Sequence, residues 1–219
     1  MSRLHRIVIA ALASLLLSQP ALARTGAEIA ALFESGVAAY DAGDYPKAYK
    51  IWWDLRYEDI AAMRNLGMML RKGQGVEKNP GQARDLFLRA ARAGLPTAQA
   101  DLADMLLKGE GGKPDLAAAL PLLQAAAAAH HPVAQFQLGQ LYETGAPPLV
   151  PQNLEVARQL YAAAAERGMP EAAERLRVVG APTTAAPLTP TVATPTAAVP
   201  AATPAGGVPT PGPAPAPAP

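Results

Sequence analysis

The stretch AMRNLGMMLRKGQGV, residues 62–76, decides the fold because it recurs twice at intervals of 36 residues. The second copy is AQADLADMLLKGEGG at 98–112, and the third is AQFQLGQLYETGAPP at 134–148. Each copy places alanine, leucine and a further apolar pair on one face of a helix and then reaches a glycine that can end that helix. A fixed period of about 20 to 50 residues indicates a solenoid, in which short structural units stack on their neighbours.

A second helix is predicted after each of these stretches. Its N-caps are Asn79, Asp115 and Asn153, whose short polar side chains can accept a hydrogen bond from a free backbone N–H. Alanines and larger apolar residues then recur in register, so each copy is predicted to form a helical hairpin. Pro121 lies six residues beyond Asp115, where its missing N–H predicts a kink or a late start of the helix.

A divergent unit precedes the three copies. Thr25 and Glu28 have the spacing of a capping box, which predicts a helix over residues 27–42 and then a second one that ends near 57. Five residues share the spacing of a tetratricopeptide unit: Gly36, Gly43, Tyr45, Ala48 and Trp52. Trp52 falls at a core position of this pattern, whereas Trp53 is expected to be half exposed. Terminal repeats are expected to diverge because one of their faces meets water.

The two ends of the chain have a different character. Residues 1–23 carry arginines, an apolar stretch and a small-x-small site, which predicts a signal peptide cleaved between Ala23 and Arg24. The predicted units between the ends are a divergent repeat (24–60), three full repeats (61–96, 97–132 and 133–170) and a capping helix (171–179). Residues 180–219 have no charged residue and 12 prolines, a composition typical of a disordered tail.

Charge and cysteine content exclude several classes of function. Without residues 1–23 the chain has 17 Lys and Arg against 18 Asp and Glu, so no basic excess remains to bind nucleic acid. No cysteine is present, which excludes a disulfide framework. The apolar stretch of eleven residues at 7–17 is too short for a membrane span, which needs about 20. We therefore expect an exported protein without a stable membrane span.

Candidate sites for chemistry have simpler structural explanations. His130 and His131 lack a third ligand for a metal, and His130 stands where the other copies have a helix-ending glycine. The glycine-rich stretch at 109–113 lacks the further glycine and the hydroxyl residue of a phosphate-binding loop. Neighbouring carboxylates at 58–59 and a lone one at Glu143 lack the separation that acid–base pairs need. We predict no catalytic residue, no metal site and no cofactor.

A partner-binding surface is predicted on the first helix of each hairpin, the helix expected to line the concave face. Met68 aligns there with polar residues of the later copies, and exposed methionine suits an adaptable binding surface. Six side chains are expected to point outward and contact a protein partner: Arg64, Met68, Gln99, Asp104, Gln135 and Gln140.

The residues at 62–76, followed by Asn79, Ala83, Phe87 and Gly94, resemble a Sel1-like repeat. The middle copy departs from this pattern at 103, 112 and 130, and the third has a longer loop at 147–148. The resemblance implies an all-α, right-handed α/α solenoid related to tetratricopeptide proteins, with no catalytic residues.

The resemblance also implies a function, that of a non-enzymatic scaffold or adaptor for protein–protein interaction in the bacterial cell envelope. Two alternatives remain open. In the first, the protein is structural and its Pro/Ala-rich tail spans or contacts the cell wall. In the second, more distant alternative, it hydrolyses cell-wall or β-lactam substrates. We expect a periplasmic or secreted location.

Overall fold

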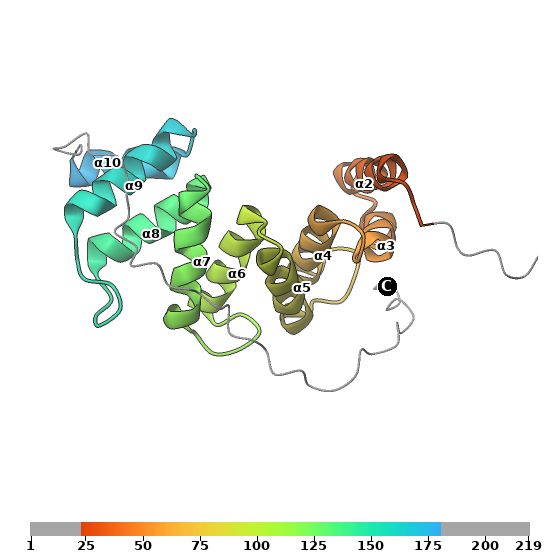
Figure 1. The fold of residues 1–219 in the computed structure, drawn as a ribbon, viewed down its shortest axis with the longest axis horizontal. Coiled ribbons are helices and arrows are strands. Elements are labelled where there is room, and N and C mark those ends of the chain that lie inside the picture. The colour runs from red at the N-terminus through yellow and green to blue at the C-terminus, as the bar shows by residue number, and fades with distance from the viewer. Residues whose placement is uncertain (1–22, 181–219) are drawn as a thin grey trace, which may run out of the picture.

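The computed structural model describes residues 23–180, and the predicted signal peptide (1–23) and tail (180–219) lie almost wholly outside this range. Within it the chain forms nine helices and no strand (Figure 1), which confirms the predicted all-α solenoid. They are α2 (Gly26–Asp41), α3 (Tyr45–Leu55), α4 (Ile60–Lys72), α5 (Pro80–Arg92), α6 (Pro96–Lys108), α7 (Leu116–Ala128), α8 (Pro132–Thr144), α9 (Leu154–Glu166) and α10 (Pro170–Val179). None of these helices is long and apolar enough to cross a membrane.

Helices follow one another as antiparallel hairpins that stack into an arch, with α2 and α10 at its two ends (Figure 1). We call α2, α4, α6, α8 and α10 the first helices and α3, α5, α7 and α9 the second helices. One apolar core runs through the stack from α2 to α9, because each helix packs on the next. Each repeat therefore buries its apolar residues against its neighbours, as expected of a solenoid.

The predicted N-caps of the second helices are present. Asn79 Oδ1 accepts a hydrogen bond from the backbone N–H of residue 82 at 3.0 Å. Asp115 and Asn153 make the same bond to residues 118 and 156, at 2.9 and 3.1 Å. Thr25 and Glu28 form the predicted capping box. These side chains satisfy N–H groups that have no partner within their helices.

The ends of the helices also follow the sequence. The first helices α4 and α6 end at glycines with positive φ, Gly73 at 74° and Gly109 at 70°. His130 takes φ 61° where the other repeats have glycine, as the sequence predicts. Of the kink or late start predicted for α7, the late start is not observed. The helix begins at Leu116, where the side chain of Asp115 caps its first turn, and it continues through Pro121.

A glycine of the first helix faces a large side chain of the second helix. A Cβ on Gly67 would lie 2.9 Å from the ring of Phe87, and one on Gly139 would lie 2.8 Å from the ring of Tyr161. Both rings are fully buried. Since such a contact is far below van der Waals distance, the two helices can approach this closely only where the first has no side chain.

The N-terminal unit and the middle repeat have different residues at this contact. Gly36 faces Trp52, whose burial confirms the predicted core position, and Trp53 is half-buried beside it. In the middle repeat Ala103 replaces the glycine, and the residue equivalent to Phe87 is Leu123. The larger first-helix residue, alanine, thus faces the smaller second-helix residue, leucine, so the summed side-chain volume at the contact stays similar.

Candidate interaction surface

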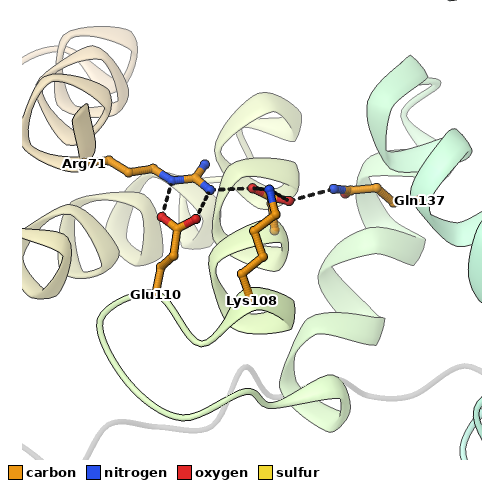
Figure 2. A network of polar contacts seen from close by, with 5 residues as sticks. Arg71, Lys108, Glu110 and Gln137 are labelled. Carbon is orange, nitrogen blue, oxygen red and sulfur yellow. Dashed lines mark hydrogen bonds and ion pairs between the residues drawn. The ribbon is translucent and has the colours of Figure 1, made fainter. Parts of the chain in front are cut away.

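Arg71 at the end of α4 links the first full repeat to the next one (Figure 2). Its Nε lies 2.6 Å from Glu110 Oε2, and its Nη2 lies 2.5 Å from Asp104 Oδ2. Asp104 also accepts hydrogen bonds from Lys108 at 2.9 Å and from Gln137 Nε2 at 3.0 Å. Gln137 belongs to α8, so the Asp104 carboxylate connects the first helices of three successive repeats, α4, α6 and α8.

The electrostatics of this network favour its charged form. Burial alone would raise the pKa of Asp104, but hydrogen bonds from Lys108 and Arg71 outweigh it and lower that pKa below the ordinary value. The hydrogen bond from Arg71 lowers the pKa of Glu110 as well. The side chains of Arg71 and Asp104 are 15% and 16% exposed, so water screens their attraction less than it screens a surface pair.

Other polar bridges also connect first helices to neighbouring repeats. Arg64 Nε of α4 lies 2.6 Å from Asp101 Oδ2 of α6, and Tyr40 of α2 donates to Gln74 Oε1 at 2.9 Å. At the far end Arg175 of α10 forms an ion pair with Glu143 of α8, with Nε 2.8 Å from Oε2. Each first helix is thus bonded to the neighbouring repeat through side chains in addition to the apolar core.

Glu143 also accepts a hydrogen bond from the hydroxyl of Tyr161 at 2.7 Å. Its hydrogen bond with Arg175 lowers the pKa of Glu143, whereas burial and the neighbouring carboxylate raise that of Tyr161. The other two carboxylates weighed as acid–base groups have structural contacts too. Glu58 pairs with Arg24 at 2.5 Å, and Asp59 caps α4. None of the three is arranged with a second carboxylate for proton transfer.

Two of the six predicted contact residues form hydrogen bonds with the preceding helix. Gln99 Nε2 donates to the carbonyl of Ala91, and Gln135 Nε2 donates to that of Ala127, both at 3.4 Å. Gln135 is 0% exposed, so its predicted exposure is wrong. The periodicity placed both residues on the first helix correctly, but this side of the helix faces the last turn of the preceding second helix. Its carbonyl groups accept these side-chain donors in addition to their backbone hydrogen bonds.

Of the other four predicted residues, three are half-buried, as Gln99 is, and one is exposed. Arg64 and Asp104 are partly buried and bonded to the neighbouring repeat. Met68 is half-buried against the core, and Gln140 is exposed. The positions equivalent to Met68, with those one turn later, form a stripe across α4, α6 and α8. We call this stripe the first-helix face; it consists of Met68, Lys72, Asp104, Lys108, Gln140 and Thr144.

The bridging residues Arg71, Glu110 and Gln137 escaped the sequence analysis, although a signal for them exists. Bonded partners are separated by 33, 37 or 39 residues, all within about one helical turn of the 36-residue repeat. Opposite charges at such separations therefore indicate contacts between the first helices of adjacent repeats. These pairs are missed when only residues 36 positions apart are compared.

The two histidines considered as metal ligands, His130 and His131, lie in the turn between α7 and α8. His131 Nδ1 accepts a hydrogen bond from the N–H of Ala134 at 3.4 Å and so caps α8. Burial lowers the pKa of His131. In the part of the chain that the structure describes, no three His, Asp or Glu side chains are grouped to hold a metal ion.

A shallow pocket of about 480 Å³ lies on the terminal helix α10. It is lined by Pro170, Glu171, Glu174, Arg175 and Val178. All five residues come from α10, so the pocket is the open end of the stack.

The family model of the Sel1 repeat matches residues 60–95, 96–131 and 132–169, just over half of the chain. The chain belongs to the Sel1 repeat family. Three repeats of this kind confirm the resemblance read from the sequence. Sel1 repeat folds commonly serve as scaffolds for protein–protein interaction, and members are generally not catalytic.

Solved structures agree with this assignment. A Sel1 repeat protein from Oxalobacter formigenes is 32% identical, with a TM-score of 0.63, over 67% of this chain and 59% of its own length. The protein c5321 of uropathogenic Escherichia coli, a protective antigen with an SLR fold, is 28% identical, with a TM-score of 0.63, over 71% of this chain and 35% of its own. The immunity protein Pa5087 of Pseudomonas aeruginosa shares the fold, at 23% identity and a TM-score of 0.51, over 71% of this chain and 60% of its own. No curated protein sequence matches.

Proposed function

We propose that this Sel1 repeat protein is a non-enzymatic scaffold in the bacterial cell envelope whose first-helix face binds a segment of a partner protein. The observation that carries the proposal is the bridge from Arg71 through Asp104 to Gln137, which fixes three first helices relative to one another. A surface held in place before binding loses little conformational freedom when the partner arrives, so more of the contact energy contributes to affinity.

We assign fewer residues to the partner contact than the sequence suggested. Gln99 and Gln135 are excluded because they bond to the preceding helix. Lys72 and Gln140 are exposed side chains of the first-helix face, and Met68 between them offers partly buried apolar area. A partner segment that crosses α4, α6 and α8 therefore meets apolar, acidic and amide positions in turn, which sets the register in which it binds.

Two observations support the envelope location. Residues 1–23 have the pattern of a signal peptide. The similar c5321 protein is a protective antigen of a bacterium, which agrees with a place outside the cytoplasm. This location is the one in which the partner is to be sought.

The test is in-cell crosslinking followed by mass spectrometry, with the full chain and with the double variant Lys72→Ala/Gln140→Ala. The matched control, Lys113→Ala/Gln82→Ala, removes the same two residue types from exposed positions outside the first-helix face. We expect one envelope protein to be captured by the full chain and by the control, and at least ~10-fold less of it by the test variant, a ratio that corresponds to about 1.4 kcal/mol. Equal capture by both variants would show that the partner binds elsewhere.

A second chain, stopped at Val179, separates this function from the structural alternative. If the first-helix face binds the partner, the shortened chain captures it as well as the full one does. Loss of capture with the tail would assign the function to residues 180–219. Release of product from cell-wall material or a β-lactam by the purified full chain would establish the hydrolase alternative.

A further inference from the structure

Positive charge is concentrated in one repeat. Residues 60–95 have seven Lys and Arg against two Asp and Glu, whereas residues 24–59 and 96–180 together have ten against sixteen. Arg64 and Arg71 of this repeat are ion-paired with the next repeat. The remaining excess lies between two parts of the chain with net negative charge, so it forms a local feature rather than a general property of the surface.

Arg56, in the turn that joins α3 to α4, lies against two aromatic rings. Its guanidinium carbon is 4.2 Å from the ring centroid of Trp53 and 4.5 Å from that of Tyr57. Trp53 in turn stacks on Tyr49 at 5.9 Å. Tyr57 is 66% exposed, the largest exposed fraction among the large apolar side chains described. The rings thus hold the guanidinium in place at the surface.

A second arginine approaches from the next second helix. The guanidinium groups of Arg56 and, less strongly, of Arg89 on α5 lower the pKa of the Tyr57 phenol against the opposing effect of burial. We call Arg56 and Tyr57, which are in direct contact, together with Arg89, whose guanidinium acts on the same phenol, the arginine–tyrosine cluster. Residues far apart in the chain meet here at the junction between the N-terminal unit and the first full repeat.

In the part of the chain that the structure describes, the cluster has no counter-ion of its own. Among residues 23–180 no carboxylate lies within 4.0 Å of the guanidinium nitrogens of Arg56 or Arg89. Neighbouring acids are engaged elsewhere, since Glu58 pairs with Arg24 and Asp59 caps α4. Asp85 lies one turn before Arg89 on α5 and makes no ion pair with it. Arg56 Nη1 donates to the backbone carbonyl of Trp53, and neither guanidinium is neutralised by a carboxylate of the described residues. Both can therefore bind an anion beside the exposed ring.

We infer that the arginine–tyrosine cluster is a docking surface for an acidic segment of a partner protein, with Arg56 and Arg89 binding its carboxylates and Tyr57 packing on its side chains. Arginine, tyrosine and tryptophan are the residues that most often dominate binding energy in protein interfaces. Arginine also binds carboxylates through two parallel hydrogen bonds. The cluster is formed by α5 and the turn after α3, apart from the first-helix face, so the protein would hold two partners, or two segments of one, at once.

The probe for the test is a dye-labelled decaglutamate peptide, added to the full chain at low salt and followed by fluorescence anisotropy. The test variant is Arg56→Gln/Arg89→Gln, and Arg89→Gln alone is included because it leaves the contact of Arg56 with the rings intact. The matched control is Lys47→Gln/Lys50→Gln, which removes two positive charges from exposed positions of α3. Circular dichroism confirms that each variant is folded.

We expect the control to bind the peptide within ~2-fold of the full chain, since its charges lie outside the cluster. Each arginine that contacts a carboxylate is worth about ten-fold in affinity, so Arg89→Gln should weaken binding ~10-fold and the double variant further. Equal weakening by the control would show a response to net charge alone and overturn the proposal. So would displacement of the peptide by stoichiometric inorganic phosphate, or tighter binding of a DNA duplex that depends on the same arginines.

Discussion

Gly67 of α4 lies directly against the buried ring of Phe87 on α5, and a Cβ at Gly67 would be 2.9 Å from Cε1 of that ring. Repeats with a ring at this place have glycine opposite it, and the repeat with leucine has alanine. The chain itself therefore contains the compensated version of the contact, which makes its energetic role measurable.

We predict that Gly67→Ala destabilises the protein, because the fully buried ring of Phe87 cannot move aside. The cost of overpacking is about 1–3 kcal/mol, less the ~1 kcal/mol that alanine gains in a helix. Adding Phe87→Leu, which copies the middle repeat, should recover most of the loss. Urea unfolding of the two single variants and the double variant gives the coupling energy.

Gly81→Ala is the control for this cycle. A Cβ there would meet Asn79 Oδ1 at an ordinary 3.5 Å, and we expect no loss of stability. Additive effects of Gly67→Ala and Phe87→Leu would contradict the proposed contact.

Gln135 provides a second test, because its environment differs from that expected of a surface residue. Gln135→Ala should lower the free energy of unfolding by about 1–3 kcal/mol, since it opens a cavity and removes the donor to the Ala127 carbonyl. Gln135→Met should cost less than Gln135→Ala, because methionine fills the space, as Met63 does at this position of the first full repeat. It also removes Gln135 Oε1, which has no partner among the described residues, and the Ala127 carbonyl still accepts from the His130 N–H. Thermal melts of both variants decide the matter.

Gln140→Ala is the corresponding surface control, and we expect a change within about 0.5 kcal/mol. If Gln135→Ala were as mild as Gln140→Ala, the burial of Gln135 would be in doubt.

Asp104 should make a pH-dependent contribution to stability. Its pKa is lowered in the folded protein, so its contribution is complete above the unfolded pKa of about 3.9 and is lost as the pH falls through the folded value. Asp104→Asn should therefore cost about 1–3 kcal/mol at pH 7 and progressively less below about pH 4. Urea unfolding at several pH values measures this difference.

The exposed pair Glu174–Arg177 offers the comparison, and Glu174→Gln should change stability by less than about 0.5 kcal/mol at any pH. A difference between Asp104→Asn and the native chain that stays constant down to pH 3 would rule out the assigned role of the charge.

His131 should respond at milder pH. Burial lowers its pKa below 6.5, so folding favours the neutral ring, and stability is lost as the pH falls from about 7 through the folded pKa. His131→Asn keeps an acceptor for the cap of α8 and removes the titration. A cap is worth ~1 kcal/mol, so the native chain should lose ~2–4 °C more in Tm than the variant between pH 7.5 and pH 5. Parallel losses in both chains would contradict this.

Much of the fold could be predicted because its determinants are local or strictly periodic. Gly73 and Asn79 mark the end of one helix and the start of the next through backbone chemistry that does not depend on the rest of the chain. Trp52 was placed in the core by its register with Phe87, and the structure confirms it.

The surface was harder to predict, because a period assigns a residue to a helix face but gives no measure of how closely the neighbouring helix approaches. Gln135 is polar and was therefore expected outside, yet the carbonyl end of α7 covers it. Asp104 was correctly placed on the first helix, but its partners Arg71 and Gln137 come from two other repeats. Such contacts depend on the angle between repeats, which the sequence of any one repeat does not specify.

The placement of Asp104 at the centre of three first helices has a consequence for how the arch opens. The middle repeats cannot fray without breaking bonds on both sides. Among the described residues, α2 is tied to the next repeat by one side-chain hydrogen bond, from Tyr40 to Gln74 in the loop after α4. Local unfolding should therefore begin at the N-terminal end and proceed from repeat to repeat along the solenoid. A partner that binds both Arg56 and Arg89 would connect the N-terminal hairpin to the first full repeat. Binding at the arginine–tyrosine cluster and closure of the N-terminal hairpin would therefore increase together.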